Sequence, residues 1–180
     1  MVIHVASPVF SKAPKNTDKV LQAAVEGTSS VLEACAQNNV KKIVVTSSIA
    51  AISHQKNLNK YFFDETDFSD EDCKNLYAKS KVLAEKKAWK LAEKHNLNLT
   101  VINPGLVIGE YLLDNETTTN FFIKRMFLNK FIAKAYIPLV SVYDVATAHV
   151  NAMEKKDISR NKRYILVENT YSIYDIIRIY

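Results

Sequence analysis

The stretch Ile43-Val44-Val45-Thr46-Ser47-Ser48 decides the fold of this 180-residue chain. Its β-branched residues run together without alternating with polar ones, which is typical of a strand buried on both faces. Apolar runs of the same kind occur at residues 2–5 and 99–102. Such strands are expected in a parallel sheet that is covered by helices on both sides.

Two segments with helical character connect these strands. Residues 17–37 carry a stripe of apolar and small side chains at helical steps, namely Val20, Leu21, Ala24, Thr28, Val31, Leu32 and Cys35. A polar stretch over 53–70 lacks periodicity and is expected to be a surface loop. The next helix is expected over about 73–95, because Ser69, Asp70 and the acids that follow suit a helix N-terminus. In such a sheet, ligands bind beyond the C-terminal strand ends.

The pattern becomes mixed in the last part of the chain. We expect an amphipathic helix over 117–129, a short extended segment over 137–140 and a helix over 142–154. A further strand over 163–167 and a final helix that begins at Ser172 follow.

Composition indicates a globular protein with a core. The chain is 48% hydrophobic and 24% charged, and no apolar run approaches the roughly 18 residues that span a bilayer. The start lacks the basic segment and apolar stretch of a secretion signal. Cys35 and Cys73 form neither a disulfide framework nor a metal cluster. We therefore expect a cytoplasmic protein with no metal and no membrane partner.

The net charge of +5 is compatible with a phosphate-bearing ligand. Solvated lysines on helix faces explain it more simply, because the basic residues form no long run. They also lack the interleaved aromatic residues of an RNA-binding module. No nucleic-acid partner is expected.

Tyr77 and Lys81 form the most informative local pattern. They are four residues apart on the second expected helix, so they share one face. That face also carries small and apolar residues, namely Ala84, Ala88 and Leu91. Most other charges of the helix lie opposite, at Lys79, Lys86, Lys90 and Glu93.

An isolated lysine on such a stripe usually extends its ammonium to solvent. The adjacent Tyr77 and the strand end at Ser47-Ser48 favour another interpretation. A buried ammonium beside the phenol would lower the pKa of Tyr77, which would then exchange protons near neutral pH.

Tyr77-Ala78-Lys79-Ser80-Lys81 resembles the Tyr-x-x-x-Lys motif of the short-chain dehydrogenases/reductases. Other segments resemble, in the same order, the extended branch that contains dihydroflavonol reductases, cinnamoyl-CoA reductases and related aldehyde reductases. These segments are Val2–Pro8, Glu26–Cys35, Val44–Ser48, Asn103–Gly109 and Val142–His149. Together they cover nearly the whole chain.

The resemblance implies a catalytic set of Ser48, Tyr77 and Lys81. Tyr77 would protonate the substrate carbonyl oxygen as hydride arrives, or deprotonate the alcohol in reverse. Lys81 would hydrogen-bond the nicotinamide ribose and lower the pKa of Tyr77. Ser48 would hydrogen-bond the substrate oxygen, with Ser47 as the alternative.

The resemblance also implies NADP(H) as the cofactor, with NAD(H) as the alternative, and a small-molecule carbonyl or alcohol as the substrate. Ala6 and Ser7 would contact the cofactor mainly through backbone atoms. Its nicotinamide end would lie against four consecutive residues, Pro104, Gly105, Leu106 and Val107. Tyr77 and Lys81 would complete the cofactor site.

The sequence departs from this family in its glycines. It has three, Gly27, Gly105 and Gly109, and no Gly-x-x-Gly-x-x-Gly turn through which backbone approaches the cofactor pyrophosphate. Glu110 stands where the family usually has proline. We therefore expect an α/β fold with a partial Rossmann-like, doubly wound parallel sheet that lacks its first strands. Binding of NADPH by these residues alone is expected to be weak.

We divide the chain into two parts. Residues 1–109 are expected to form the partial NAD(P)-binding domain with the catalytic groups. Residues 110–180 are expected to combine a small substrate-binding portion with returning Rossmann elements. Substrate contacts are expected from 53–70 and 110–135.

Three functions remain open at this point. The first is an NADP(H)-dependent carbonyl reductase of the dihydroflavonol-reductase type. The second is a nucleotide-sugar epimerase or dehydratase, and the third is a non-catalytic fragment that does not bind cofactor. A serine hydrolase lacks support, because the Gly-x-Ser-x-Gly elbow is missing and Asp144 and His149 suit structural roles better.

Overall fold

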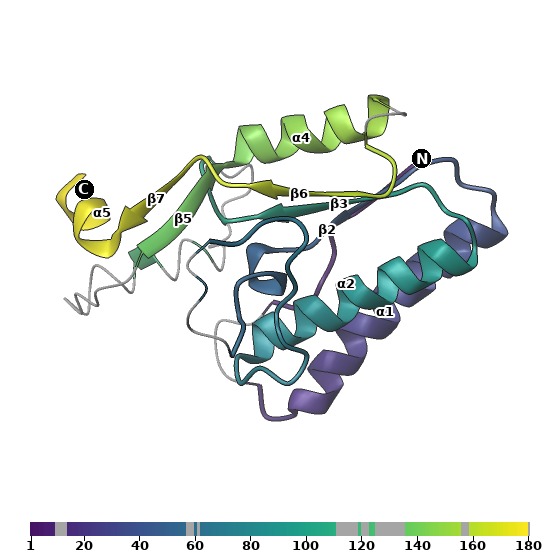
Figure 1. The fold of residues 1–180 in the computed structure, drawn as a ribbon, viewed down its shortest axis with the longest axis horizontal. Coiled ribbons are helices and arrows are strands. Elements are labelled where there is room, and N and C mark those ends of the chain that lie inside the picture. The colour runs from purple at the N-terminus through teal and green to yellow at the C-terminus, as the bar shows by residue number, and fades with distance from the viewer. Residues whose placement is uncertain are drawn as a thin grey trace.

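The computed structural model describes residues 1–9, 14–56, 60, 62–110, 119, 123–124, 136–155 and 159–179. In this part of the chain, a parallel sheet has helices on both faces, and a second, smaller sheet lies beyond one of its ends (Figure 1). The helix expected over 117–129 lies almost entirely outside the described residues.

The first sheet, as far as the structure describes the chain, has four parallel strands in the order β1-β2-β3-β6. Their bounds are β1 Val2–His4, β2 Ile43–Thr46, β3 Leu99–Pro104 and β6 Lys162–Leu166. The predicted parallel sheet is confirmed. Its β-branched runs stand in the middle, where β2 is almost entirely buried and β3 is buried at every residue.

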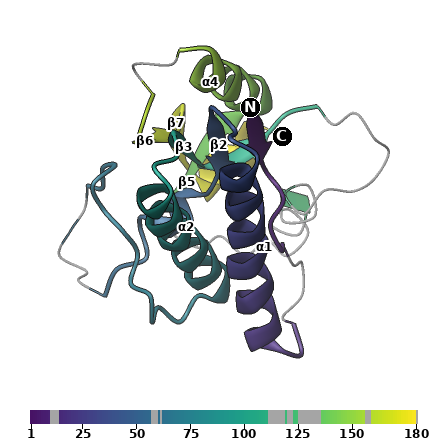
Figure 2. The same ribbon diagram turned by 90° about the vertical axis from the view of Figure 1, so that its right-hand side faces the viewer.

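Helices cover both faces of this sheet, as predicted. Helices α1 (Thr17–Gln37) and α2 (Leu76–Lys94) lie side by side on one face, and α4 (Val142–Glu154) lies on the other (Figure 2). The predicted stripe of α1 supplies its buried residues, Ala24, Thr28, Leu32 and Cys35. Leu32 and Cys35 join Leu91 of α2 and the strands in one hydrophobic cluster, so the stripe serves core packing.

The predicted start of α2 was wrong. The helix begins at Leu76, and its N-cap is Asn75, whose side chain accepts a hydrogen bond from the backbone N–H of Ala78 at 3.0 Å. Ser69 and Asp70 instead hold the preceding loop, because their side chains accept hydrogen bonds from the backbone of residues 54 and 56. Local turn chemistry competed for the same capping residue types.

The second sheet has the order β4-β5-β7 within the described residues, with β4 Leu106–Ile108, β5 Tyr136–Ser141 and β7 Asn169–Ser172. The third strand of the first sheet is longer than the apolar run at 99–102 indicated. Strand β3 continues to Pro104, because its ladder with β6 is maintained through a hydrogen bond from Gly105 N–H to the Leu166 carbonyl at 2.9 Å. Gly105 then leads directly into β4.

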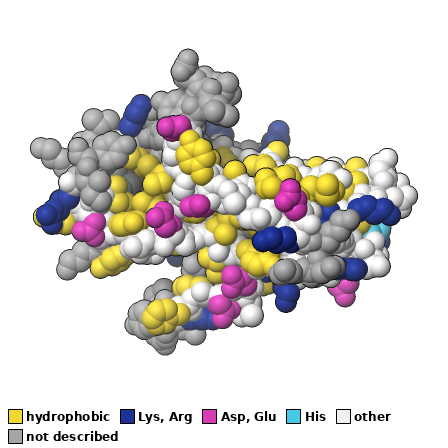
Figure 3. All heavy atoms as spheres, turned by 90° about the horizontal axis from the view of Figure 1, so that it is seen from above, with side chains coloured by type: hydrophobic (Ala, Val, Ile, Leu, Met, Phe, Trp, Pro, Cys, Tyr) yellow, Lys and Arg dark blue, Asp and Glu magenta, His cyan; other side chains and the backbone are white. Residues whose placement is uncertain are grey.

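The elements expected from residue 137 onward are confirmed, whereas strand β7 was not predicted. Strand β5 and helix α4 include the ranges expected for them, and the bounds of β6 differ by one residue from the expected 163–167. Helix α5 (Ile173–Ile179) follows Ser172, whose Oγ accepts a hydrogen bond from Asp175 N–H. Figure 3 views the α4 side, where hydrophobic side chains lie among charged ones. In the part of the chain that the structure describes, no helix combines the length and apolarity needed to cross a membrane.

Candidate active site

Ser48 lies just beyond β2, where the short helix η1 (Ile49–Ala51) begins. Its Oγ accepts a hydrogen bond from Ala50 N–H at 3.2 Å, and the residue is buried. Its carbonyl accepts a hydrogen bond from Asn103 Nδ2 of β3 at 3.1 Å. Ser48 is therefore held both by its own turn and by the neighbouring strand.

Tyr77 lies in the first turn of α2, where interaction with the Ser48 side chain acts to lower the pKa of its phenol. The two residues line one cavity of about 630 Å³. This volume lies in the range of small-molecule sites. The end of β2 and the start of α2 thus bring together Ser48 and Tyr77, which are far apart in the sequence.

Lys81 lies one helical turn after Tyr77 and is only 6% exposed. Its Nζ lies over the Tyr77 ring, 5.6 Å from the ring centroid. Burial lowers the pKa of Lys81 to about 8, although the charge of Glu85 acts in the opposite direction. The prediction that Lys81 lies on the buried face is confirmed, and the alternative of an ammonium extended to solvent is excluded.

The prediction that Lys81 lowers the pKa of Tyr77 was wrong. Burial raises the pKa of Tyr77, and the interaction with the Ser48 side chain is what opposes this rise. The physical reason is that removal from water disfavours the charged phenolate more than its surroundings favour it. Tyr77 therefore keeps its proton at neutral pH.

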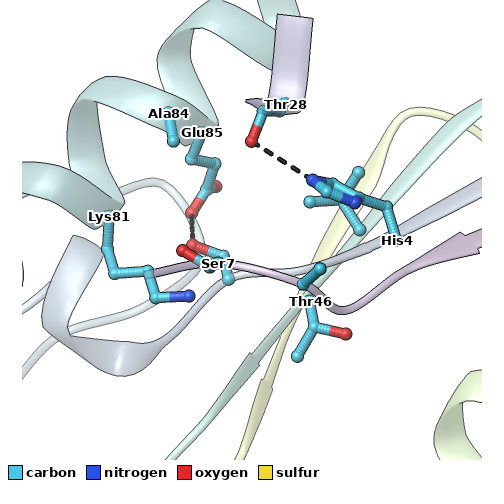
Figure 4. A pocket seen from close by; sticks show the side chains of 10 residues that line it. His4, Ser7, Thr28, Thr46, Lys81, Ala84 and Glu85 are labelled. Carbon is cyan, nitrogen blue, oxygen red and sulfur yellow. Dashed lines mark hydrogen bonds between the residues drawn. The ribbon is translucent and has the colours of Figure 1, made fainter. Parts of the chain in front are cut away.

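The residues expected at the cofactor fall into two groups. Ala6, Ser7 and Lys81 line a narrow cavity of about 10 Å³ (Figure 4). Residues 105–107 line the larger cavity with the serine and the tyrosine. Pro104 is buried at the end of β3 and is not part of either lining.

The larger cavity has further walls that the motifs did not identify. Ser53, His54 and Thr119 line it, and they lie within the ranges 53–70 and 110–135 from which substrate contacts are predicted. The other side is formed by consecutive residues of β5, Tyr136, Ile137 and Pro138. Burial lowers the pKa of His54 from its usual 6.5, so this imidazole is neutral at neutral pH.

Gly105 is required by the close approach of β5. A Cβ at this position would lie 2.5 Å from the carbonyl oxygen of Pro138. Because no side chain fits there, the glycine allows the strand end to lie directly against the second sheet.

Glu85 carries a buried carboxylate that the motifs did not identify. Its Oε2 accepts hydrogen bonds from Ser47 Oγ at 2.6 Å and Asn103 Nδ2 at 2.9 Å. Its Oε1 accepts a hydrogen bond from Arg163 Nε at 2.6 Å. A signal was present in the sequence, because Glu85 follows Lys81 by four residues and so lies about 40° from it around the helix.

His149 has hydrogen-bond partners at both ring nitrogens. Nδ1 donates to the Val145 carbonyl at 2.7 Å, and Nε2 lies 2.7 Å from Thr46 Oγ1. This pairing ties α4 to the end of β2, which suits the structural role expected for it. The described residues contain no group of three or more His, Cys, Asp or Glu side chains that could hold a metal.

A parallel α/β sheet that presents serine, tyrosine and lysine beyond its strand ends is the arrangement of the short-chain dehydrogenases/reductases. The chain matches the 3-beta hydroxysteroid dehydrogenase/isomerase family over residues 1–178, and it belongs to that family.

Individual relatives agree with the resemblance to cinnamoyl-CoA reductases. Cinnamoyl-CoA reductase CAD2 of Medicago truncatula is 35% identical over 99% of this chain and 56% of its own length. Tetraketide alpha-pyrone reductase 2 of Arabidopsis thaliana is 34% identical over 88% of this chain and 52% of its own length. The chain thus spans about half the length of the curated relatives it matches.

Solved structures share the fold. Gre2 of Candida albicans, in a complex with NADPH, superimposes with a TM-score of 0.82 at 30% identity over 98% of this chain and 60% of that one. Yeast methylglyoxal/isovaleraldehyde reductase Gre2, also with NADPH, gives a TM-score of 0.83 at 25% identity over 97% of this chain and 58% of that one. The Rossmann-like fold class is therefore confirmed.

Proposed function

We propose that this chain carries the catalytic groups of an NADPH-dependent carbonyl reductase that converts a small ketone or aldehyde to its alcohol. The observation that supports this most directly is that Ser48 and Tyr77 line one cavity of about 630 Å³, with the buried Lys81 over the Tyr77 ring. The names of the relatives, which are reductases, and the NADPH in both Gre2 structures support the reaction type and the cofactor.

Each residue of the pair has a distinct role in this proposal. When bound, NADPH supplies the hydride that reaches the carbonyl carbon. Ser48 donates a hydrogen bond to the carbonyl oxygen, on which negative charge develops. Tyr77 transfers its phenolic proton to that oxygen as the general acid. In the reverse direction, Tyr77 accepts the alcohol proton.

The residues present fit the nicotinamide end of the cofactor. Lys81 is a hydrogen-bond donor that lines the narrow cavity together with Ala6 and Ser7. Gly105 keeps the wall of the larger cavity free of a side chain. The family resemblance assigns these groups to the ribose and the nicotinamide. The pyrophosphate would need a glycine-rich turn, which the 180 residues do not contain.

The division of the chain at residue 109 is part of the proposal. Residues 1–109 would carry the catalytic and cofactor groups, whereas residues 110–180 would face the substrate through β5 and return to the first sheet through β6. We also propose a cytoplasmic location, which suits the free thiols of Cys35 and Cys73.

The test uses reduced nicotinamide mononucleotide, because this half of the cofactor needs no pyrophosphate site. We expect the chain to oxidise it at millimolar concentration when a small aldehyde is added, with formation of the alcohol. Tyr77→Phe removes the proton donor and should lower the rate by about 10²- to 10⁴-fold. Tyr143→Phe changes an exposed tyrosine on α4 and serves as the matched control.

Two results would count against the proposal. Equal turnover in Tyr77→Phe and the unmodified chain would remove Tyr77 from the mechanism. Conversion of a nucleotide sugar without net oxidation of the reduced nicotinamide would favour the epimerase or dehydratase alternative, since those reactions involve no net redox change.

A further inference from the structure

Glu85 connects the helix that carries Tyr77 and Lys81 to the strand ends that surround them. It is 1% exposed, yet its carboxylate accepts hydrogen bonds from β3 and from the residue just beyond β2. The same amide group of Asn103 that donates to Glu85 also donates to the Ser48 carbonyl. One carboxylate therefore fixes both Ser47 and, through Asn103, the backbone of Ser48.

Glu85 also faces the buried lysine. Lys81 and Glu85 project from α2 into the same narrow cavity, together with His4 from β1 (Figure 4). Among the described residues that line this cavity, Glu85 is the only carboxylate. Burial and the charge of Lys81 both lower the pKa of His4, so His4 adds no positive charge at neutral pH. Tyr77, the other titratable group beside Lys81, is also neutral.

The second carboxylate oxygen of Glu85, Oε1, contacts Arg163. Arg163 donates to Oε1, and its guanidinium also donates to the carbonyls of Glu65 and Asp67 and lies 3.8 Å from the centroid of the Phe68 ring. If Glu85 only held Arg163 against the loop that contains Glu65 and Asp67, the hydrogen bond to Oε1 would be sufficient. Oε2 instead faces the strand ends beside the lysine.

We infer that Glu85 is a positioning residue of the Ser48–Tyr77–Lys81 site, whose carboxylate keeps Lys81 charged and fixes the strand end that carries Ser48. The inference rests on the proposed function, because a charged lysine matters only if Lys81 binds the nicotinamide ribose. Without the carboxylate, burial would act on the ammonium unopposed, and Lys81 would lose its proton at a lower pH. The carboxylate thus sets the pH range in which the site is intact.

The test measures the titration of Lys81 directly. In the chain labelled with ¹³C at lysine Cε, NMR spectra are recorded as a function of pH, and the Lys81 signal is assigned by its loss in Lys81→Met. Glu85→Gln keeps the shape of the side chain without its charge and should lower the pKa of Lys81 by about one unit or more. Glu85→Asp keeps the charge and should restore most of the shift. Glu93→Gln, on the exposed part of α2, is the matched control and should change nothing.

The titration needs neither cofactor nor substrate, so a failure of the reductase assay leaves it intact. Where turnover is measurable, the alkaline limb of the pH profile should move down in Glu85→Gln by the same amount as the Lys81 pKa. A Lys81 pKa that is unchanged in folded Glu85→Gln would overturn the inference.

The charge of Arg163 could prevent Glu85→Gln from folding, since it would be left buried without its partner. The double variant Glu85→Gln/Arg163→Met removes both charges and should show the same lowered pKa of Lys81. If this variant also loses the dispersed spectrum of a folded protein, the role of Glu85 is structural and the inference is wrong.

Discussion

Replacing Lys81 with methionine should stabilise the protein, and the gain should shrink as the pH rises. Methionine keeps an unbranched side chain at this position but has no ammonium to remove from water. Burial lowers the pKa of Lys81 to about 8 from its ordinary 10.5. Between these values the unfolded chain binds more protons than the folded one, so stability rises with pH in the wild type. The variant lacks this contribution.

The size of the effect follows from the two pKa values. Each unit of difference corresponds to about 1.4 kcal/mol. At pH 7 the folded state therefore carries a cost of about 3 kcal/mol for the charged lysine, which falls to about 1 kcal/mol at pH 9.5. Lys81→Met should raise the free energy of unfolding by these amounts at the two pH values.

Urea unfolding followed by circular dichroism measures the difference at each pH. Lys90→Met is the matched control, because Lys90 lies on the exposed part of the same helix and should give no such pH dependence. A difference between Lys81→Met and the wild type that stays constant from pH 7 to pH 9.5 would refute the argument from burial.

Four further substitutions test the site and its supports. Ser48→Ala should lower aldehyde-dependent turnover at least tenfold. Ser47→Ala should mainly lower the free energy of unfolding, by about 1–2 kcal/mol, because the buried Glu85 carboxylate loses a hydrogen-bond donor. If instead Ser47→Ala lowers turnover and Ser48→Ala does not, Ser47 is the substrate-binding residue. Gly105→Ala places a Cβ 2.5 Å from the Pro138 carbonyl oxygen and should cost about 1–3 kcal/mol in thermal unfolding, and an unchanged Tm would contradict that contact. Arg163→Met leaves the buried carboxylate without its cation and should cost about 3–5 kcal/mol in urea unfolding, so a loss below about 1 kcal/mol would argue against a buried pair.

The sequence predicted the parts of the fold that depend on local periodicity. The β-branched run at 43–45 had to be buried on both faces, and the stripe of α1 had to face the core. The start of α2 could not be predicted in the same way. Ser69, Asp70 and Asn75 are all good capping residues, and only the tertiary arrangement of the loop decides which of them caps the helix.

The site was predictable to the same extent. Tyr77 and Lys81 share a helical face, so their proximity follows from spacing alone. The β5 wall and the partnership of Glu85 with Arg163 depend on segments that are distant in sequence, and no local pattern reveals them. The sequence nevertheless places two charged residues, Lys81 and Glu85, on the apolar stripe of α2, and both are buried. Charged residues on a core-facing stripe need polar or charged partners when they are buried.

The raised pKa of Tyr77 bears on the direction of proton transfer. A phenol that keeps its proton at neutral pH is ready to donate it, which is what reduction of a carbonyl requires. Oxidation of an alcohol would instead need the phenolate, whose formation burial opposes. Burial also lowers the pKa of Lys81 to about 8, so the lysine keeps its charge at neutral pH at a cost in stability. A core designed for stability alone would have an apolar residue at position 81, so this cost supports the proposed role of the Lys81 ammonium.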